Sequence, residues 1–338
     1  MILVTGGAGF LGKEVVRLLL TQYQQQVRCL VRPSTSDRVF KDLFGDDLPA
    51  SLEIFPASFN DLAELRKAIQ GVDIVLHLAA SLTGSVPAQV ANTVVGSENL
   101  FNVCVEEKIS RFVLCSSFGV FAASHVPKNK VIDESVPMEE HPESRDPYSF
   151  SKHMQEQLAW QFYHEKGLPL VVIRPGVVFG PPVNILSSRV GLSLFGMFLH
   201  LGGQNLLPLT YKANCADLII KAGLVPGIEG EVFCAVDDNL PSSSYMLSRY
   251  KKETRKILSI RIPYILLRQL AKLNVWYSSR THGHLPTVFT PYKVDAMWKG
   301  HHFSNRKAKE KLQWSPQVSM REALDITYGY LKNGSSPS

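Results

Sequence analysis

The chain has 338 residues, 45% hydrophobic and 20% charged, a balance typical of soluble globular proteins and long enough for one large core or two unequal lobes. The net charge of +6 comes from dispersed basic residues, enriched only at 249–256 and without interleaved aromatic residues, which argues against a nucleic-acid partner. Five scattered cysteines form no CxxC pair and accompany no histidine cluster, so we expect reduced thiols, a cytoplasmic location and no metal site.

A glycine-rich bend follows the first apolar run, Ile2–Val4. Because this strand begins at once, we expect no signal peptide before the fold. The bend carries Gly6, Gly9 and Gly12 and opens a helix expected over Lys13–Thr21. One glycine permits the tight turn, one lets the backbone approach a pyrophosphate, and one lets the helix lie close to the strand. The free N–H groups at the positive end of this helix would hold the phosphates of a dinucleotide.

The end of the second expected strand, Val27–Val31, bears on which dinucleotide is bound. An acidic residue there pairs with the ribose 2′-OH of NAD, whereas an arginine accommodates the 2′-phosphate of NADP. Val31 stands where the acid would lie, and Arg32 follows it. We therefore predict that NADP(H) is preferred and that NAD(H) is the weaker alternative. A surface Arg32 with no ligand is the other interpretation.

Strands and helices alternate from residue 1 to about residue 182. This alternation predicts an α/β fold, a doubly wound parallel sheet of the Rossmann kind with helices on both faces. The expected strands are Ile2–Val4, Val27–Val31, Leu52–Phe55, Ile74–Leu78, Phe112–Cys115 and Leu170–Ile173. The expected helices are Lys13–Thr21, Leu62–Ile69, a stretch within 88–107 and Ser149–Lys166. Ligands of such sheets bind at the carboxyl ends of the strands, where the glycine bend, Ala79, Ser117 and Pro175 all fall.

Tyr148 and Lys152 begin the last of these helices. Residues four apart lie on one helix face, one turn above the other. An ammonium held close to a phenol favours the phenolate, which makes the phenol usable as a proton donor or acceptor near neutral pH. Many solvated helices carry such a pair without any function, so the pair gains weight only beside the glycine bend.

Together these motifs resemble the short-chain dehydrogenase/reductase superfamily, in the extended branch that includes nucleotide-sugar epimerases, dihydroflavonol-type reductases and 3-beta-hydroxysteroid dehydrogenases. The resemblance covers nearly the whole chain. The motifs that carry it, in the family's order, are the glycine bend, His77-Leu78-Ala79-Ala80, Ser116-Ser117, Tyr148 with Lys152, and the run from Arg174 to Pro181.

The resemblance implies roles for individual residues. Tyr148 would exchange a proton with the reacting oxygen, Lys152 would lower the pKa of Tyr148 and bond the nicotinamide ribose, and Ser117 would orient the substrate oxygen. Ser58 and Phe59 stand where the family usually places an aspartate near the adenine. The full set expected at the cofactor is Gly6, Gly9, Phe10, Leu11, Gly12, Arg32, Ser58, Phe59, Leu78, Ala79, Ala80, Tyr148, Lys152, Pro175 and Val177. A homodimer is a further expectation from the family.

The first 182 residues would form the dinucleotide-binding domain, and residues 183–332 mainly a smaller substrate-binding lobe, with part of 206–222 returning to the sheet. Residues 333–338 have the composition of a disordered tail. The segment 257–277 is too interrupted by Arg and Lys to span a bilayer. We expect it to pack its leucines inward, and peripheral contact with a membrane is the less favoured alternative.

Three absences concern the substrate. Phe118 and Gly119 stand where related sugar-nucleotide dehydratases carry an acidic pair. Val177 and Leu207 stand where many sugar-nucleotide enzymes carry an Asn and an Arg that hold the diphosphate. Desolvating a diphosphate without an arginine is costly, so an apolar pocket is the better expectation. Its candidate residues are Phe118, Val178, Phe179 and the run 192–201, with Phe118 and Val178 as substrate contacts.

The leading hypothesis is an NADP(H)-dependent oxidoreductase that interconverts a secondary alcohol and a ketone on an apolar, sterol-, flavonoid- or polyketide-like small molecule. A nucleotide-sugar epimerase that keeps its NAD(P) is the alternative. A non-catalytic NAD(P)-binding scaffold or sensor is the third hypothesis, which an intact Ser117, Tyr148 and Lys152 disfavour.

Overall fold

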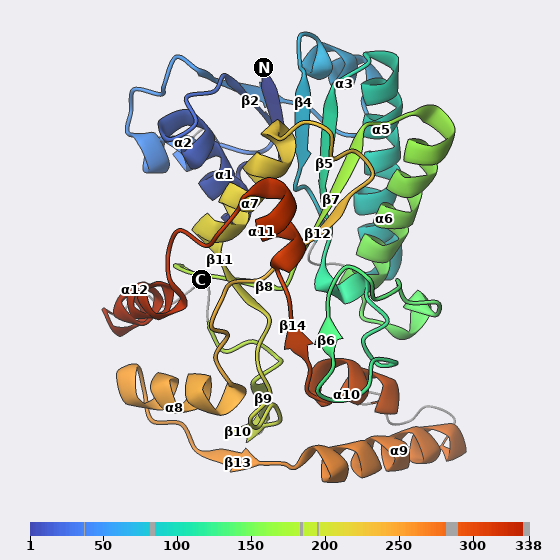
Figure 1. The fold of residues 1–338 in the computed structure, drawn as a ribbon, viewed down its shortest axis with the longest axis vertical. Coiled ribbons are helices and arrows are strands. Elements are labelled where there is room, and N and C mark those ends of the chain that lie inside the picture. The colour runs from blue at the N-terminus through green and yellow to red at the C-terminus, as the bar shows by residue number, and fades with distance from the viewer. Residues whose placement is uncertain (37, 82–84, 183–184, 195, 282–289, 334–338) are drawn as a thin grey trace.

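The computed structural model describes residues 1–36, 38–81, 85–182, 185–194, 196–281 and 290–333. The central sheet contains β1 (Ile2–Thr5), β2 (Val27–Val31), β3 (Leu52–Pro56), β4 (Ile74–His77), β5 (Arg111–Cys115), β7 (Leu170–Pro175) and β12 (Val232–Ala235). Their order is β12-β7-β5-β4-β1-β2-β3, and every neighbouring pair is parallel (Figure 1). The order reverses between β1 and β4, so the sheet is doubly wound. The predicted α/β fold is confirmed.

Helices cover both faces of this sheet and bury two separate apolar layers. One face carries α1 (Phe10–Thr21), α2 (Arg38–Phe44), α7 (Lys212–Leu224) and α11 (Arg306–Leu312). The other carries α3 (Leu62–Ile69), α5 (Gly96–Glu106) and α6 (Pro147–Lys166). A short helix, α4 (Val86–Val90), and a π-helical turn, Ala91–Val95, lead into α5.

Local chemistry fixes the ends of the helices that hold the site. Asp146 caps α6 by accepting a hydrogen bond from the Ser149 amide, and Pro147 occupies the first helical position. Gly167 ends α6 in the left-handed region, at φ 72°. Asp61 caps α3 through its carboxylate, which accepts from the amides of Ala63 and Glu64.

Segments beyond residue 182 return to the sheet. Helix α7 packs its buried residues, among them Leu218 and Ile219, in the same apolar layer as α1, and β12 adds an edge strand beside β7. The carboxylate of Asp237, after β12, binds Thr210, the Tyr211 amide and Asn214, which ties these returning segments together. Helix α7 and strand β12 thus belong to the same layers as the first 182 residues. The division into a dinucleotide domain and a substrate lobe at residue 182 stays a proposal.

The remaining elements form the lower part of the molecule in Figure 1. A three-stranded sheet has the order β13 (Ser259–Arg261), β10 (Met197–His200) and β9 (Gly191–Leu194). Two further strand pairs are β8 (Val177–Phe179) with β11 (Leu209–Tyr211), and β6 (Val131–Ile132) with β14 (His302–Phe303). The helices are α8 (Ser243–Glu253), α9 (Tyr264–Arg280), α10 (Pro291–Trp298) and α12 (Met320–Lys332), and short 3-10 helices span Phe118–Val120 and Pro142–Ser144.

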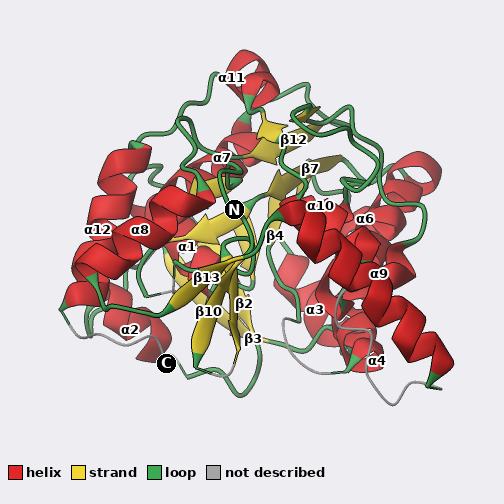
Figure 2. Cartoon of the chain, turned by 90° about the horizontal axis from the view of Figure 1, so that it is seen from below, coloured by secondary structure: helices red, strands yellow, loops and turns green. Residues whose placement is uncertain are grey.

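Helix α9 corrects an expectation. We predicted that the segment 257–277 packs its leucines inward, but only Leu267 and Ala271 of α9 are buried. Leu266, Leu270 and Leu273 are exposed. The reason is that α9 carries apolar residues on both of its faces, and only the inner face meets α10. Figure 2 looks at this end of the molecule and shows α9 and β13 lying across it.

Candidate active site

The glycine bend lies directly against the segment that follows β4. Gly6 has φ +72°, and a Cβ there would lie 2.8 Å from the amide nitrogen of Ala79. A Cβ on Gly12 would lie 2.1 Å from the carbonyl oxygen of Gly6. Only glycine fits either position, because a side chain would force the bend away from the strand ends. The bend and residues 78–80 therefore meet at the carboxyl edge of β1 and β4.

The start of α1 fits a dinucleotide phosphate. Gly9 precedes the helix and offers no side chain to cap it, and the first turn contains no acidic residue. The amides of Phe10, Leu11 and Gly12 thus lie in a turn whose N–H groups lack partners within the helix. Such amides, at the positive end of a helix, are a suitable anion site. The glycine bend and the first turn of α1 therefore fit the phosphates of the expected dinucleotide.

Three further candidates for cofactor contact follow β2 and β3. Arg32 is exposed at the end of β2, and no ion pair or hydrogen bond to its guanidinium is seen among the described residues. Ser58 is also exposed, and its hydroxyl accepts from the Asn60 amide. The ring of Phe59 packs edge-on against His77, so its side chain faces the protein interior. Arg32 is thus the charged group available at this edge.

Tyr148 and Ser117 come together from different elements. Ser117 follows β5 in an extended conformation, and its hydroxyl accepts from the Gly119 amide at 3.0 Å. Tyr148 lies in the first turn of α6, with its phenol on the side of the Ser117 hydroxyl. Burial raises the pKa of Tyr148, and the Ser117 hydroxyl opposes that rise. The phenol therefore carries its proton at neutral pH.

Lys152 is turned into the protein. Its ammonium donates to the carbonyl oxygen of Cys115 at 2.6 Å and to Oε1 of Gln155 at 2.9 Å. The side chain is buried, and burial lowers the pKa of Lys152. We expected Lys152 to lower the pKa of Tyr148. In the structure, burial of Tyr148 dominates and the ammonium is engaged by Cys115 and Gln155.

A buried polar network continues from Lys152 to the glycine bend. Gln155 donates to Ser97 at 2.7 Å, and its Nε2 lies 3.0 Å from Nε2 of His77. Nδ1 of His77 lies 2.7 Å from the hydroxyl of Thr5, the last residue of β1. Burial, with the charge of Lys152 second, lowers the pKa of His77 to about 3. The network thus connects α6, β4, α5 and β1 with a neutral imidazole at its centre.

From the sequence we assigned no role to Gln155 or to the His77 side chain. Two signals were present. Gln155 follows Lys152 by three residues, which places both on one helix face, and His77 opens the run that ends in two alanines. Neither signal states which residues meet in space.

A buried ion pair holds α6 to β7. Nη2 of Arg174 lies 2.5 Å from Oε1 of Glu156, and both side chains are almost inaccessible. Ser116 donates to the other carboxylate oxygen of Glu156. The Arg174 guanidinium also stacks over Phe121 at 4.6 Å. Arg174 thus has a structural role at the start of the run that ends in Pro181.

Residues after β7 border the same edge. Pro175 ends β7 and is buried, while Val177 and Val178 in β8 are half-buried. The amide of Val177 donates to the carbonyl oxygen of Pro208, which fixes β8 beside β11. Val178 packs partly against the apolar layer under α1. Their side chains stay candidates for contact with a ligand.

The predicted contact of Phe118 with a substrate stays a prediction. Its side chain is buried, with its ring edge-on to Phe121 and beside Phe303. It belongs to a small apolar cluster that joins the loop after β5 to β12. Within the run 192–201, Phe198 and Leu201 are likewise buried in two separate clusters. Aromatic character alone did not distinguish core from pocket.

Arg189, to which we assigned no role from the sequence, is a charged group without a partner among the described residues. No hydrogen bond or ion pair to its guanidinium is seen in the described part of the chain. Burial and the neighbouring charge of Arg145 lower the pKa of Arg189 to about 10. Arg145 itself donates to the carbonyl oxygen of Gly119, two residues after Ser117. An uncompensated arginine here is suited to an anionic group of a ligand.

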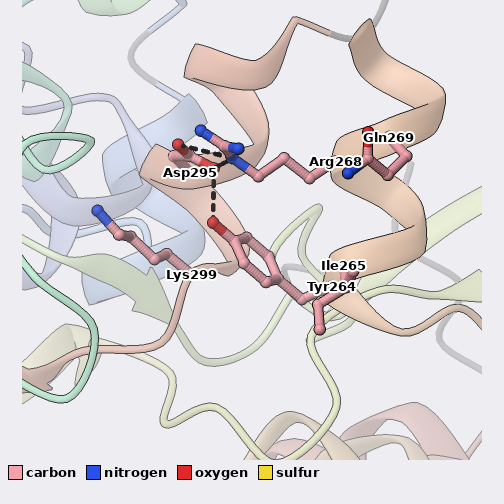
Figure 3. A pocket seen from close by; sticks show the side chains of 6 residues that line it. All are labelled: Tyr264, Ile265, Arg268, Gln269, Asp295 and Lys299. Atoms are coloured by element: carbon pink, nitrogen blue, oxygen red, sulfur yellow. Dashed lines mark hydrogen bonds and ion pairs between the residues drawn. The ribbon is translucent and has the colours of Figure 1, made fainter. Parts of the chain in front are cut away.

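Other features lie apart from these residues. A pocket between α9 and α10 is lined by Tyr264, Ile265, Arg268, Gln269, Asp295 and Lys299, and none of them is a predicted site residue (Figure 3). The described residues contain no group of three or more side chains that could hold a metal ion. No described helix is long and apolar enough to cross a membrane.

The chain is similar to known proteins over most of its length. The model of the NAD dependent epimerase/dehydratase family matches residues 2–206. A 3beta-hydroxysteroid-dehydrogenase/decarboxylase of Arabidopsis thaliana is 26% identical, over 99% of this chain and 81% of the relative. A decarboxylating sterol-4-alpha-carboxylate 3-dehydrogenase of Dictyostelium discoideum is 28% identical, over 96% of this chain and 98% of the relative.

A solved structure extends the likeness in three dimensions. UDP-glucuronic acid 4-epimerase from Bacillus cereus, in complex with UDP-glucuronic acid and NAD, superposes with a TM-score of 0.72 and 21% identity, covering 98% of this chain and 99% of that one. This likeness shows that the fold is shared over the whole chain.

Proposed function

The chain belongs to the NAD dependent epimerase/dehydratase family, and from this premise we propose that it is an NADP(H)-dependent oxidoreductase. Its reaction would interconvert a secondary alcohol and a ketone on an apolar small molecule. One observation carries the proposal: the phenol of Tyr148, beside the Ser117 hydroxyl, belongs to the same sheet edge as the glycine bend. A proton donor and a dinucleotide cradle at one edge suit hydride transfer coupled to proton transfer.

The preference for NADP(H) is supported by Arg32. Its guanidinium is exposed at the end of β2, and the described residues offer it no acidic partner. A planar, permanently charged guanidinium suits the 2′-phosphate, and Val31 offers no carboxylate for a ribose hydroxyl. The backbone of residues 78–80, together with Pro175 and Val177, would border the rest of the cofactor.

When bound, the nicotinamide supplies the hydride chemistry. Tyr148, whose pKa burial raises, donates its proton to the substrate oxygen in the direction of reduction. Ser117 orients the substrate oxygen beside the phenol. Lys152 places a positive charge one turn further along α6, where Cys115 and Gln155 fix its position. In the direction of oxidation, the Tyr148 phenolate accepts the proton of the substrate hydroxyl.

The substrate class is supported by the relatives and by Arg189. Two relatives have names that specify sterols or hydroxysteroids, and one of these names specifies a sterol carboxylate. Half-buried Val177 and Val178 suit an apolar molecule. Arg189, without a partner among the described residues, would bind an acidic substituent on that molecule.

Arg189 also favours a second candidate. We had expected no arginine for a sugar-nucleotide diphosphate, because Leu207 stands in the usual place. Arg189 supplies such a charge from another segment. A nucleotide-sugar epimerase that retains its NAD(P) is therefore the alternative, and a non-catalytic scaffold or sensor is the third candidate.

We also propose that the protein is a homodimer and that it is cytoplasmic. Light scattering of the purified protein tests the homodimer.

A substrate screen separates these candidates. The protein is incubated with apolar ketones, secondary alcohols and sugar nucleotides, each with NADPH and with NADH, while nicotinamide absorbance and products are followed. The proposal predicts stoichiometric consumption of NADPH with an apolar ketone. Conversion of a sugar nucleotide without a net absorbance change would establish the epimerase instead. If the protein binds the nucleotide but converts none of the compounds, the result would support the non-catalytic scaffold or sensor.

A further inference from the structure

One end of the molecule presents a continuous row of exposed apolar side chains. On α9, Ile265, Leu273 and Trp276 are 74%, 57% and 53% exposed. We define the β13–α9 surface as eight exposed apolar residues of these elements and their approach, Leu258, Ile260, Ile265, Leu266, Leu270, Leu273, Trp276 and Tyr277. Figure 1 shows α9 and β13 along the lower edge of the molecule, and Figure 2 shows them facing outward there. Scattered single residues need no explanation, but a row of this length on one helix does.

The opposite face of α9 is fixed to the protein. Leu267 and Ala271 are buried in a cluster with Val294 and Trp298 of α10. Asp295 accepts from the hydroxyl of Tyr264 at 2.7 Å and from Nε of Arg268 at 3.0 Å, and Figure 3 shows its carboxylate between the two. These contacts set the rotation of α9, so its other apolar face must point away from the molecule.

The charge around this surface has one sign. No Asp or Glu occurs from residue 254 to residue 294. Five basic residues beside the apolar row are exposed and make no ion pair within the described part of the chain, namely Arg255, Lys256, Arg261, Lys272 and Arg280. Arg280 lies over the ring of Trp276 at 5.4 Å. Apolar side chains bordered by unpaired cations, with Trp and Tyr near the end of the helix, are the composition of an interfacial helix.

We propose that the β13–α9 surface docks on the surface of an anionic lipid bilayer, with α9 parallel to the membrane plane. The apolar row would enter the interface, and the five cations would meet the lipid phosphates. A second copy of the chain fits this surface less well. A two-fold contact sets the same patch against itself, which brings the unpaired cations together without a carboxylate between them.

Vesicle flotation of the full chain tests this proposal without requiring turnover or a known substrate. Vesicles of phosphatidylcholine alone are compared with vesicles of phosphatidylcholine and phosphatidylglycerol in equal parts. We expect the protein to float with the anionic vesicles, and raised salt to weaken that binding. Leu273→Glu should lower the vesicle partition coefficient at least about tenfold, and Lys272→Gln about fivefold, the effect of one charge near an anionic surface.

The matched control is Leu62→Glu, a leucine that is 41% exposed on α3. It should float like the unchanged protein, and thermal unfolding should show that all three variants are folded. Failure of the unchanged protein to float with anionic vesicles overturns the proposal. Equal flotation of Leu273→Glu does so as well. Self-association that Leu273→Glu abolishes, with no vesicle binding, would assign the surface to a second copy. Because NADPH consumption is measured separately, the proposed reaction and this inference fail independently.

Discussion

At the scale of the residue, Arg32 and His77 show how one side chain sets a measurable property. Arg32 is exposed and has no partner among the described residues, which leaves its charge available to a ligand. His77 is fully enclosed and bonded through both ring nitrogens, which keeps it neutral. The first should affect cofactor choice, and the second should affect stability against acid.

Replacing Arg32 by Asp should reverse the cofactor preference. The change removes the partner of the 2′-phosphate and adds a carboxylate that can accept from a ribose hydroxyl. We expect the ratio of kcat/KM for NADPH over that for NADH to fall roughly 10- to 100-fold, the value of one charge-assisted hydrogen bond. Arg306→Asp, at an exposed arginine of α11, should leave the ratio unchanged. An equal ratio in Arg32→Asp and the unchanged protein would remove Arg32 from the cofactor site.

His77 should make the protein less stable in acid. Its pKa is lowered from 6.5 to about 3 in the folded state. Between these values the unfolded chain binds the extra proton, so the free energy of unfolding falls as pH falls below 6.5. Through His77, each pH unit below 6.5 lowers the free energy of unfolding by about 1.4 kcal/mol at most. Burial raises the pKa of Asp237 to about 6, which acts in the opposite direction as pH falls from about 6 to 3.8.

The difference between two proteins isolates the histidine. In His77→Gln, which cannot titrate, denaturant unfolding at several pH values should show a shallower loss of stability below pH 6.5. His164→Gln, at an exposed position of the same helix as Tyr148, should keep the slope of the unchanged protein. Parallel pH profiles for His77→Gln and the unchanged protein would show that the imidazole does not stay neutral.

At the scale of the element, the ion pair of Glu156 with Arg174 joins α6 to β7. Removing one partner leaves an unpaired buried charge, so Arg174→Met should lower the free energy of unfolding by about 3–5 kcal/mol. Arg38→Met, which breaks the exposed pair with Asp42, should cost less than about 1 kcal/mol. Adding Glu156→Met to Arg174→Met should recover part of the loss. Similar small losses for the Arg174 and Arg38 variants would contradict a structural ion pair.

The elements themselves were largely predictable because long periodic segments determine them. Strand β2 and helix α3 have the predicted bounds, Val27–Val31 and Leu62–Ile69. Strands β9 and β10 were not predicted, because the Gly-, Ser- and Leu-rich run around them has no clear period. In α9 the period predicts a helix but not which of its two apolar faces is covered, so the expected burial of Leu266 and Leu273 was wrong.

Contacts between distant residues were less predictable than the elements. His77 and Gln155 are 78 positions apart, and their contact depends on how α6 packs against β4. For the same reason the sequence did not predict the position of Arg189 or the apolar cluster that contains Phe118. The glycine bend was predictable because much of its reason is local: Gly6 has a positive φ, and a Cβ on Gly12 would meet the carbonyl oxygen of Gly6.

At the scale of the whole molecule, we propose that two separate regions bind different ligands. The carboxyl edge of the parallel sheet would hold the dinucleotide, and the β13–α9 surface would meet the lipid. A ligand that binds only the folded chain stabilises it by mass action, about 2.7 kcal/mol at one hundred times its dissociation constant. Thermal unfolding should therefore shift upward with NADPH, and less with NADH at the same concentration. Equal shifts for both nucleotides would contradict the predicted preference.

The most direct test of the central claim is turnover by Tyr148→Phe, measured as NADPH consumption on a ketone found in the substrate screen. The substitution removes the proton and keeps the ring, so kcat should fall roughly 10²–10⁴-fold while NADPH still raises the unfolding temperature. The control, Tyr163→Phe on the same helix, should keep its activity. Near-normal turnover by Tyr148→Phe would show that this phenol is not the proton donor.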